Sequence, residues 1–217
     1  MDAKQRLLDA TRALLWEQGY ESTSPRAIQA RAGAGQGSFY HHFTGKLDLA
    51  SQALDQTCDA MLASVDALVD AIADGDDPLR ALARYLSQPR DALRGCRLGR
   101  HAAETAIDLP EIARPVARYF DGLTDALGRC VARLAADGRL APDVDRTALV
   151  DALVASVQGG YVLARVHRDP SRLDAALRGT QTMLRALVRP SGDGSTGDDP
   201  TDSANASTDP STPHEDS

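Results

Sequence analysis

Hydrophobic residues recur along this chain at steps of three and four positions, which is the period of an α-helix. The first such segment begins at Lys4 and is followed by Gly19, a residue type that commonly ends a helix. The pattern predicts a helix over 4–18 whose apolar face is formed by Leu7, Leu8, Thr11, Leu14 and Leu15.

Two short helices are predicted next. Ser24 precedes Pro25, so a hydroxyl can cap free amides and the proline occupies the first turn, where its missing N–H costs nothing. Gly33 ends this helix after about two turns, and a third helix begins near Gly37. Two short helices joined by a glycine-containing turn form a helix-turn-helix. In the third helix Phe39 and Phe43 are expected to face inward, leaving more accessible Ser38, Tyr40, His41 and His42.

Longer helices are predicted over 46–73 and near 77–88, 97–107, 110–136, 145–167 and 170–188, and no strand pattern competes with them. We therefore expect an all-α fold with a small three-helix domain over 1–46 and a larger helical domain over 47–190. The helix over 46–73 carries a continuous apolar stripe of Leu47, Ala50, Leu54, Cys58, Met61, Val65, Leu68 and Ile72.

The net charge of −7 is a property of the end of the chain. Residues 191–217 hold seven of the 31 acids and none of the 24 lysines and arginines, so the part over 1–190 is formally neutral. The same segment has no large apolar side chain, which predicts a disordered acidic tail. It either keeps the protein soluble or regulates it, for example by competing with DNA for basic residues.

The remaining composition limits the compartment and the chemistry. The chain has no run of about 18 apolar residues and no apolar signal region near its start, so we expect a cytoplasmic protein with no membrane partner. The three cysteines are widely spaced and odd in number, which favours reduced thiols over a disulfide framework or a zinc site. No metal and no cofactor is therefore expected. These cysteines are Cys58, Cys96 and Cys130.

The stretch "GAGQGSFYHHF" over 33–43 has two interpretations. A nucleotide-binding loop would follow a strand or end in a lysine and serine pair, and neither is present. A turn followed by a DNA-reading helix fits better, because such a helix needs polar side chains near its start and nearby groups for phosphate. Gln36 and Ser38 can reach base edges, and Tyr40 and His41 can contact either bases or phosphate. Phosphate contacts are also expected from Thr23, Ser24, Arg26 and Lys46.

The stretch "GYESTSPRAIQARAGAGQGSFYHHFTGKLDL" resembles the DNA-binding domain of the TetR family of bacterial transcriptional regulators. The resemblance covers about the first 50 residues. Pro25, Gln29 and the pair Ala34-Gly35 depart from the usual pattern, which affects the operator sequence more than the fold. The motif positions that match are Gly19, Thr23, Ile28, Gly33, Gly37, Ser38, Phe39, Tyr40, His42, Phe43 and Lys46.

This resemblance implies a transcriptional regulator, not an enzyme. Repression is the commoner behaviour of the family and activation is the alternative; a repressor would leave a near-palindromic double-stranded DNA operator when an unidentified small-molecule effector binds. His42 is as well placed to brace the turn as to touch DNA. The DNA-binding set that the resemblance implies is Thr23, Ser24, Arg26, Gln36, Gly37, Ser38, Tyr40, His41, His42 and Lys46.

In TetR-like proteins the last two long helices pair with those of a second subunit, which implies a homodimer here. The helices over 145–167 and 170–188 look too apolar for a monomer surface, and we expect an interface of about 2,000 Å² or more. The alternative is burial of these faces inside one subunit. The predicted interface residues are Leu149, Leu153, Ser156, Gly160, Leu163, Leu177, Thr180 and Leu184.

An effector pocket is expected between the helix over 46–73 and the helices near 77–136, and it is predicted to be largely apolar. The alternative is that these residues are plain core. The candidate lining residues are Met61, Val65, Tyr85, Cys96, Leu98, Ala102, Tyr119, Phe120 and Leu123.

Cys96 supports two further hypotheses. Arg94 and Arg97 flank it and would lower the pKa of its thiol, as in a sensor of electrophiles or oxidants; the alternative is a small packing residue. An all-α enzyme would combine it with His101 and Glu104, but no oxyanion hole or cofactor motif is apparent. A nonspecific DNA-binding protein is disfavoured because the body of the chain carries no excess positive charge.

Overall fold

The computed structural model describes residues 2–189, and the predicted tail over 191–217 lies outside them, as do the side chains of Leu68 and Ile72. The described part is all-α, as predicted, and contains no strand. Its elements are α1 (Ala3–Gln18), α2 (Pro25–Ala32), α3 (Gln36–His42), α4 (Lys46–Ala73), α5 (Pro78–Ser87), the 3₁₀ helices η1 (Gly99–Ala103) and η2 (Thr105–Asp108), α6 (Pro110–Ala136), α7 (Arg146–His167) and α8 (Ser171–Leu187).

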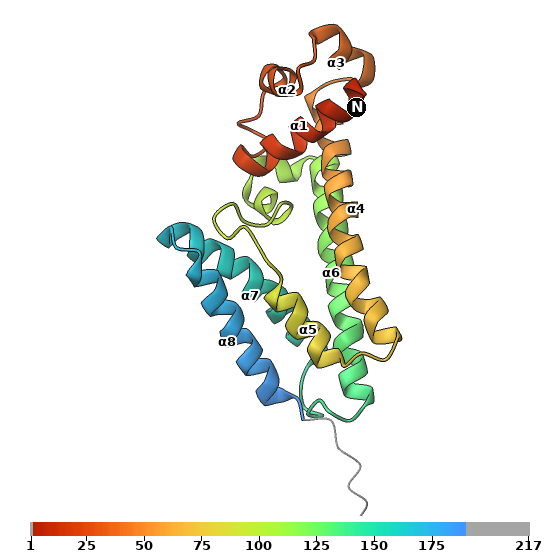
Figure 1. The fold of residues 1–217 in the computed structure, drawn as a ribbon, viewed down its shortest axis with the longest axis vertical. Coiled ribbons are helices and arrows are strands. Elements are labelled where there is room, and N and C mark those ends of the chain that lie inside the picture. The colour runs from red at the N-terminus through yellow and green to blue at the C-terminus, as the bar shows by residue number, and fades with distance from the viewer. Residues whose placement is uncertain (1, 190–217) are drawn as a thin grey trace, which may run out of the picture.

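These helices form an elongated molecule (Figure 1). Helices α1, α2 and α3 gather at one end, and α4 runs from that end beside α6 along the length of the larger domain. Helices α7 and α8 form an antiparallel pair, in which α7 packs directly on α6, while α5 contacts α4, α6 and α8. The predicted domain boundary at 46–47 falls in the first turn of α4, so one continuous helix joins both parts.

The predicted signals for α2 are confirmed. The Ser24 side chain accepts a hydrogen bond from the Ala27 amide at 3.1 Å, and Pro25 occupies the first turn. Gly33 ends the helix in the left-handed region at φ 59°, which a side chain would disfavour. Helix α3 is then held by two buried rings, Phe39 and Phe43, which are 0% and 2% exposed.

The segment over 97–107 differs from the predicted α-helix. It forms η1 and η2, whose hydrogen bonds join residues three positions apart, as in a 3₁₀ helix. For example, the Glu104 N–H donates to His101 O at 3.1 Å. Glu104 separates the two in an extended conformation (φ −94°, ψ 147°), and its carboxylate accepts the Tyr20 amide of the N-terminal domain at 2.8 Å. A tertiary contact therefore overrides the local helix preference.

Helices α7 and α8 pack closely within one subunit. A Cβ on Gly160 would lie 2.5 Å from Leu173 Cδ1, so only glycine permits this approach without a shift of Leu173. This packing covers most of the residues predicted for the dimer interface. The sequence periodicity identifies an apolar face but cannot tell whether it packs inside the subunit or against a second one. Leu149 and Ser156 are half-buried and Leu163 is exposed, whereas five of the eight predicted residues are buried inside the subunit: Leu153, Gly160, Leu177, Thr180 and Leu184.

The opposite side of the α7–α8 pair remains apolar and exposed. We call it the outer face, and its large side chains are Val162, Leu163, Val166, Met183 and Leu187, which are 61%, 46%, 72%, 61% and 38% exposed. Of the described helices, α7 alone is long and apolar enough to cross a membrane, with a mean hydropathy of 1.4 over its most apolar stretch. Only a third of that stretch is buried within the subunit, so α7 carries more apolar surface than its own chain covers.

The adjacent residues Phe39 and Tyr40 give a matched stability test. Phe39→Ala should lower the free energy of unfolding by about 3–5 kcal/mol, because it leaves a cavity in the core of the N-terminal domain. Tyr40→Ala should cost about 1 kcal/mol or less, because its ring is 57% exposed. Urea denaturation followed by circular dichroism compares the two variants, and equal losses of stability would contradict the assigned packing of α3.

Candidate nucleic-acid interface and inner cavity

Helix α3 lies at the end of the molecule opposite the C-terminal ends of α4 and α6 (Figure 1). Tyr40 is 57% exposed, and its ring meets the buried Phe39 ring edge-on with centroids 5.1 Å apart, which orients it. The other residues predicted to contact the operator from this helix are exposed or half-exposed: Gln36, Gly37, Ser38 and His41. The inner rings therefore fix α3 while its outer side stays free for a partner.

The start of α2 adds two accessible polar groups beside α3. Ser24 is exposed and its hydroxyl can still donate a hydrogen bond while it caps the helix. Arg26 is exposed and has no ion pair or hydrogen bond within residues 2–189. Both can reach an anion without breaking a contact, as their predicted role requires.

Thr23 does not fit its predicted role as a phosphate contact. Its side chain is 2% exposed, and its hydroxyl donates to Gly19 O at 2.6 Å. The hydroxyl satisfies a backbone carbonyl released at the end of α1, so it holds the turn before α2 instead of facing outward. The motif position is occupied as expected, but it stabilises the fold.

Lys46 and His42 are half-buried. The Lys46 ammonium donates to Tyr20 O at 2.8 Å and lies 3.9 Å from the centroid of the Tyr20 ring. Burial lowers the pKa of Lys46, with Glu104 and Glu21 opposing that shift. Lys46 therefore holds the start of α4 against Tyr20, in the segment after α1, and its ammonium has further N–H groups that could contact phosphate. His42 packs edge-on against the exposed His41 ring at 4.7 Å.

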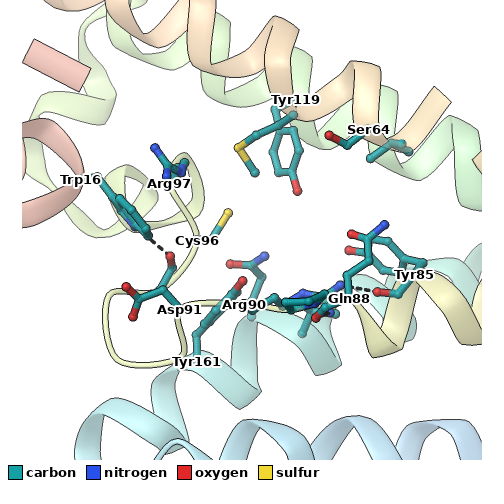
Figure 2. A pocket seen from close by; sticks show the side chains of 16 residues that line it. Trp16, Ser64, Tyr85, Gln88, Arg90, Asp91, Cys96, Arg97, Tyr119 and Tyr161 are labelled. Atoms are coloured by element: carbon teal, nitrogen blue, oxygen red, sulfur yellow. Dashed lines mark hydrogen bonds between the residues drawn. The ribbon is translucent and has the colours of Figure 1, made fainter. Parts of the chain in front are cut away.

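A cavity of about 270 Å³ lies inside the larger domain, between α4, α5, α6, α7 and the loop over 88–97 (Figure 2). Trp16, near the end of α1, forms part of its wall, so the cavity borders the N-terminal domain. Its lining residues are Trp16, Met61, Ser64, Val65, Tyr85, Gln88, Pro89, Arg90, Asp91, Gly95, Cys96, Arg97, Tyr119, Val157, Gln158 and Tyr161.

Five of the nine residues predicted for the effector pocket line this cavity: Met61, Val65, Tyr85, Cys96 and Tyr119. Leu98 and Leu123 are fully buried outside its lining, Phe120 is half-buried, and Ala102 is exposed on η1. Ala102 lies outside the lining because the segment over 97–107 forms η1 and η2 and not one α-helix. The expectation of a largely apolar pocket is also wrong, since the polar part of the wall includes Gln88, Arg90, Asp91, Arg97 and Gln158.

The cavity tyrosines are neutral hydrogen-bonding groups. Burial raises the pKa of Tyr161 to about 12 and raises those of Tyr85 and Tyr119, and the nearby Cys96 adds to each shift. The Tyr119 hydroxyl points into the hollow towards the loop that carries Cys96 (Figure 2). The Cys96 side chain is 6% exposed, and its sulfur accepts the Gly99 amide at 3.2 Å.

The other two thiols are packed as predicted. Cys58 and Cys130 are 0% and 2% exposed. Burial raises the pKa of Cys58 and raises that of Cys130 to about 11. Within residues 2–189, no group of three or more His, Cys, Asp or Glu side chains could hold a metal ion.

The cavity wall is joined directly to α1. Trp16 Nε1 donates to Gly95 O at 2.9 Å, and the Arg94 and Arg97 guanidinium carbons lie 4.7 and 3.8 Å from the centroid of the Trp16 ring. Arg100 donates to Trp16 O. We call these contacts, together with the bond from Tyr20 N–H to Glu104, the α1 junction.

Gly19 and His101 complete the α1 junction. Gly19 has φ 84°, and a Cβ there would collide with the Glu104 carboxylate, so glycine lets the carboxylate reach the end of α1. His101 is fully buried with Nδ1 3.2 Å from Glu104 Oε1, and burial lowers the pKa of its imidazole. It does not line the cavity, so it does not share a site there with Cys96.

Comparisons with known proteins agree with this architecture. The family model described as "Bacterial regulatory proteins, tetR family" matches residues 7–53, and the model described as "Tetracyclin repressor-like, C-terminal domain" matches residues 77–180. The HTH-type transcriptional repressor DhaR of Mycobacterium sp. strain GP1 is 25% identical over 177 residues, which cover 80% of this chain and 88% of DhaR.

Solved structures show the same fold. A TetR-family transcriptional regulator from Agrobacterium tumefaciens superposes with a TM-score of 0.74 at 25% identity, covering 86% of this chain and 98% of that one. The reduced form of Escherichia coli NemR gives a TM-score of 0.72 at 18% identity, covering 88% and 99%. With the helix-turn-helix and the C-terminal domain both matched, the chain belongs to the TetR family of bacterial helix-turn-helix transcriptional regulators.

Proposed function

We propose that this regulator is a homodimeric repressor that binds a near-palindromic operator through α3 and is released when a small molecule fills the inner cavity. The observation that carries the proposal is the α1 junction, because Trp16, Gly95 and Arg97 belong at once to the cavity wall and to the contacts that hold α1. Repression also agrees with the name of the similar DhaR.

The DNA contacts follow from the geometry of the N-terminal domain. Helix α3 enters the major groove with Gln36 and Tyr40, four residues apart and both accessible, directed at the operator. Ser24 and Arg26 at the start of α2 contact phosphate, which sets the position of α3 along the groove. The buried Thr23 and the Lys46–Tyr20 contact keep α1, α2 and α4 in place during binding.

The outer face of α7 and α8 is the proposed dimer interface. Its exposed apolar side chains include Val162, Val166 and Met183, and a second copy would cover them. Gly159 and Gly179 on the same two helices are exposed and would allow close helix approach. A dimer that reads a near-palindrome needs its two α3 helices about 34 Å apart, one for each major-groove half-site.

A dimer makes modest coupling sufficient for regulation. Allosteric couplings are usually about 1–3 kcal/mol, or roughly 5–150-fold in affinity. If a ligand changes the orientation of both N-terminal domains, both half-sites weaken together. The structure offers no specific support for the alternative of a thiol sensor. The Cys96 side chain is nearly buried, and its sulfur already accepts a hydrogen bond from a backbone amide.

Tyr40→Ala and Arg26→Gln should affect operator binding differently. Tyr40→Ala should weaken binding to the operator by about 1–3 kcal/mol and reduce discrimination among DNA sequences, because it removes the proposed contact between α3 and the operator. Arg26→Gln should weaken binding to every sequence and reduce the slope of the salt dependence by about one unit, because it removes one charged phosphate partner.

Fluorescence anisotropy of duplexes tiled across the DNA upstream of the gene measures both effects. Arg133→Gln, at the far end of α6 where Arg133 pairs with Asp137, is the matched control and should bind as the wild type does. Weak binding of the wild-type protein to every duplex, without a preferred site, would count against the proposed repressor.

Val166→Asp should break the proposed dimer, because a carboxylate would be placed in the middle of an apolar interface. Size-exclusion chromatography with light scattering should give twice the subunit mass for the wild type and one subunit mass for Val166→Asp. Leu93→Asp, which changes an exposed leucine on the loop over 88–98, is the control and should remain a dimer. A wild-type protein with one subunit mass at micromolar concentration would refute the dimer.

A further inference from the structure

We propose that the effector is a small aromatic carboxylate, whose charge pairs with Arg97 inside the cavity and draws that guanidinium away from Trp16. This inference rests on the proposed function, since it names the ligand of the same cavity. It follows from the one charged side chain in the cavity wall for which residues 2–189 show neither an ion pair nor a hydrogen bond, and from the rings around it.

Arg97 has no counter-ion within the described residues. Its guanidinium lies 3.8 Å from the centroid of the Trp16 ring, and no carboxylate comes within 4.0 Å of it. Burial lowers the pKa of Arg97, and the neighbouring charges of Arg12 and Arg94 lower it further, while Asp91 opposes them. An arginine still keeps its proton at neutral pH, so the cavity wall holds a partly desolvated cation that an anion would stabilise.

The other charged groups of the wall are already occupied. Arg90 donates to the backbone oxygens of Tyr85, Leu86 and Gln88, and these hydrogen bonds stabilise the end of α5. The Asp91 carboxylate accepts the Arg94 amide at 3.1 Å and lies 3.7 Å from Arg94 Nε. The uncompensated charge of the cavity is therefore positive, which favours an anionic ligand over a cationic one.

The rest of the wall suits an aromatic ring. Tyr85, Tyr119 and Tyr161 surround the hollow with ring faces and edges, and burial keeps their phenols protonated as hydrogen-bond donors. The volume of about 270 Å³ lies just below the usual range of about 300–1,000 Å³ for drug-sized ligands. A single ring with a carboxylate fits these dimensions better than a long or polycyclic molecule.

Trp16 and Arg97 also border a second hollow on the outer side of the α1 junction, where an anion could bind instead. There the other arginines have partners. Arg31 pairs with Glu17 at 2.5 Å, and Arg94 and Arg12 lie 3.5 and 3.6 Å from Glu17 and Asp9. The outer hollow has four arginines against Asp9 and Glu17, but every arginine there except Arg97 has an acid within 4.0 Å, and no tyrosine lines it. The inner cavity is therefore the favoured site.

Binding there would act on DNA affinity through a short path. Arg97 follows directly after Gly95 and Cys96, and Gly95 O accepts the Trp16 indole N–H. A carboxylate that turns Arg97 inward removes the cation stacked on Trp16 and pulls on the same loop. The end of α1 then loses part of the α1 junction, which frees the N-terminal domain to leave its operator-binding orientation.

Trp16 is the only tryptophan of the chain, so its fluorescence reports on the site directly. Benzoate and phenylacetate are titrated into the DNA-free protein, each beside its uncharged amide, with calorimetry as a second measurement. The acids should change Trp16 emission saturably, and the amides should bind roughly 10-fold more weakly or worse, because they lack a charge-assisted bond to Arg97. Equal binding of acid and amide, or no saturable binding of either acid, would overturn the proposal without any variant.

Variants then locate the site. Arg97→Gln should weaken acid binding by roughly 10-fold or more and remove the preference over the amide, whereas Arg12→Gln in the outer hollow and the distant Arg133→Gln should bind as the wild type does. Equal losses of affinity in Arg12→Gln and Arg97→Gln would place the anion in the outer hollow and overturn the assignment. DNA binding is measured separately: operator binding without acid binding refutes only this inference, and acid binding without operator binding refutes only the repressor.

Discussion

The proposed regulation depends on the α1 junction. Trp16 is fixed by a hydrogen bond from its ring N–H and by two guanidinium groups over its faces, while Glu104 accepts the backbone amide that follows Gly19. Most of these contacts are polar and directional, so a small displacement weakens several at once. The N-terminal domain is otherwise joined to the rest chiefly through the continuous helix α4, which leaves the junction to set its orientation.

A run of arginines lies at and beside this junction, away from the proposed DNA surface. Arg90, Arg94, Arg97 and Arg100 recur at steps of three or four, and the contacts they make are with Trp16, with nearby backbone oxygens and with acids of the same region. The body over 1–190 has no excess positive charge, so long-range attraction to DNA is weak. Sequence recognition by this fold must then come from hydrogen bonds of α3 and not from charge alone.

The sequence predicts those parts of the structure that local chemistry decides. Ser24-Pro25 and Gly33 bound α2 because capping and a left-handed backbone are local requirements. The helix predicted through Glu104 is wrong because the partner of that carboxylate, the Tyr20 amide, is 84 positions away. Thr23 matches its motif but turns inward for a local reason that the motif does not reveal, since its hydroxyl donates to the Gly19 carbonyl at the end of α1. Periodicity also cannot distinguish the α8-facing side of α7 from its outer face, because both are apolar.

Helix α7 explains why one ligand can affect two distant properties. Gly160 faces α8, Val157, Gln158 and Tyr161 line the cavity, and Val162 and Val166 belong to the outer face. A molecule in the cavity therefore contacts α7, which carries part of the proposed dimer interface, as well as Trp16 of the N-terminal domain. In the proposed dimer, the spacing of the two α3 helices depends on both the dimer interface and the α1 junction. A ligand placed between them would then need only a small displacement to move the α3 helices away from the two half-sites.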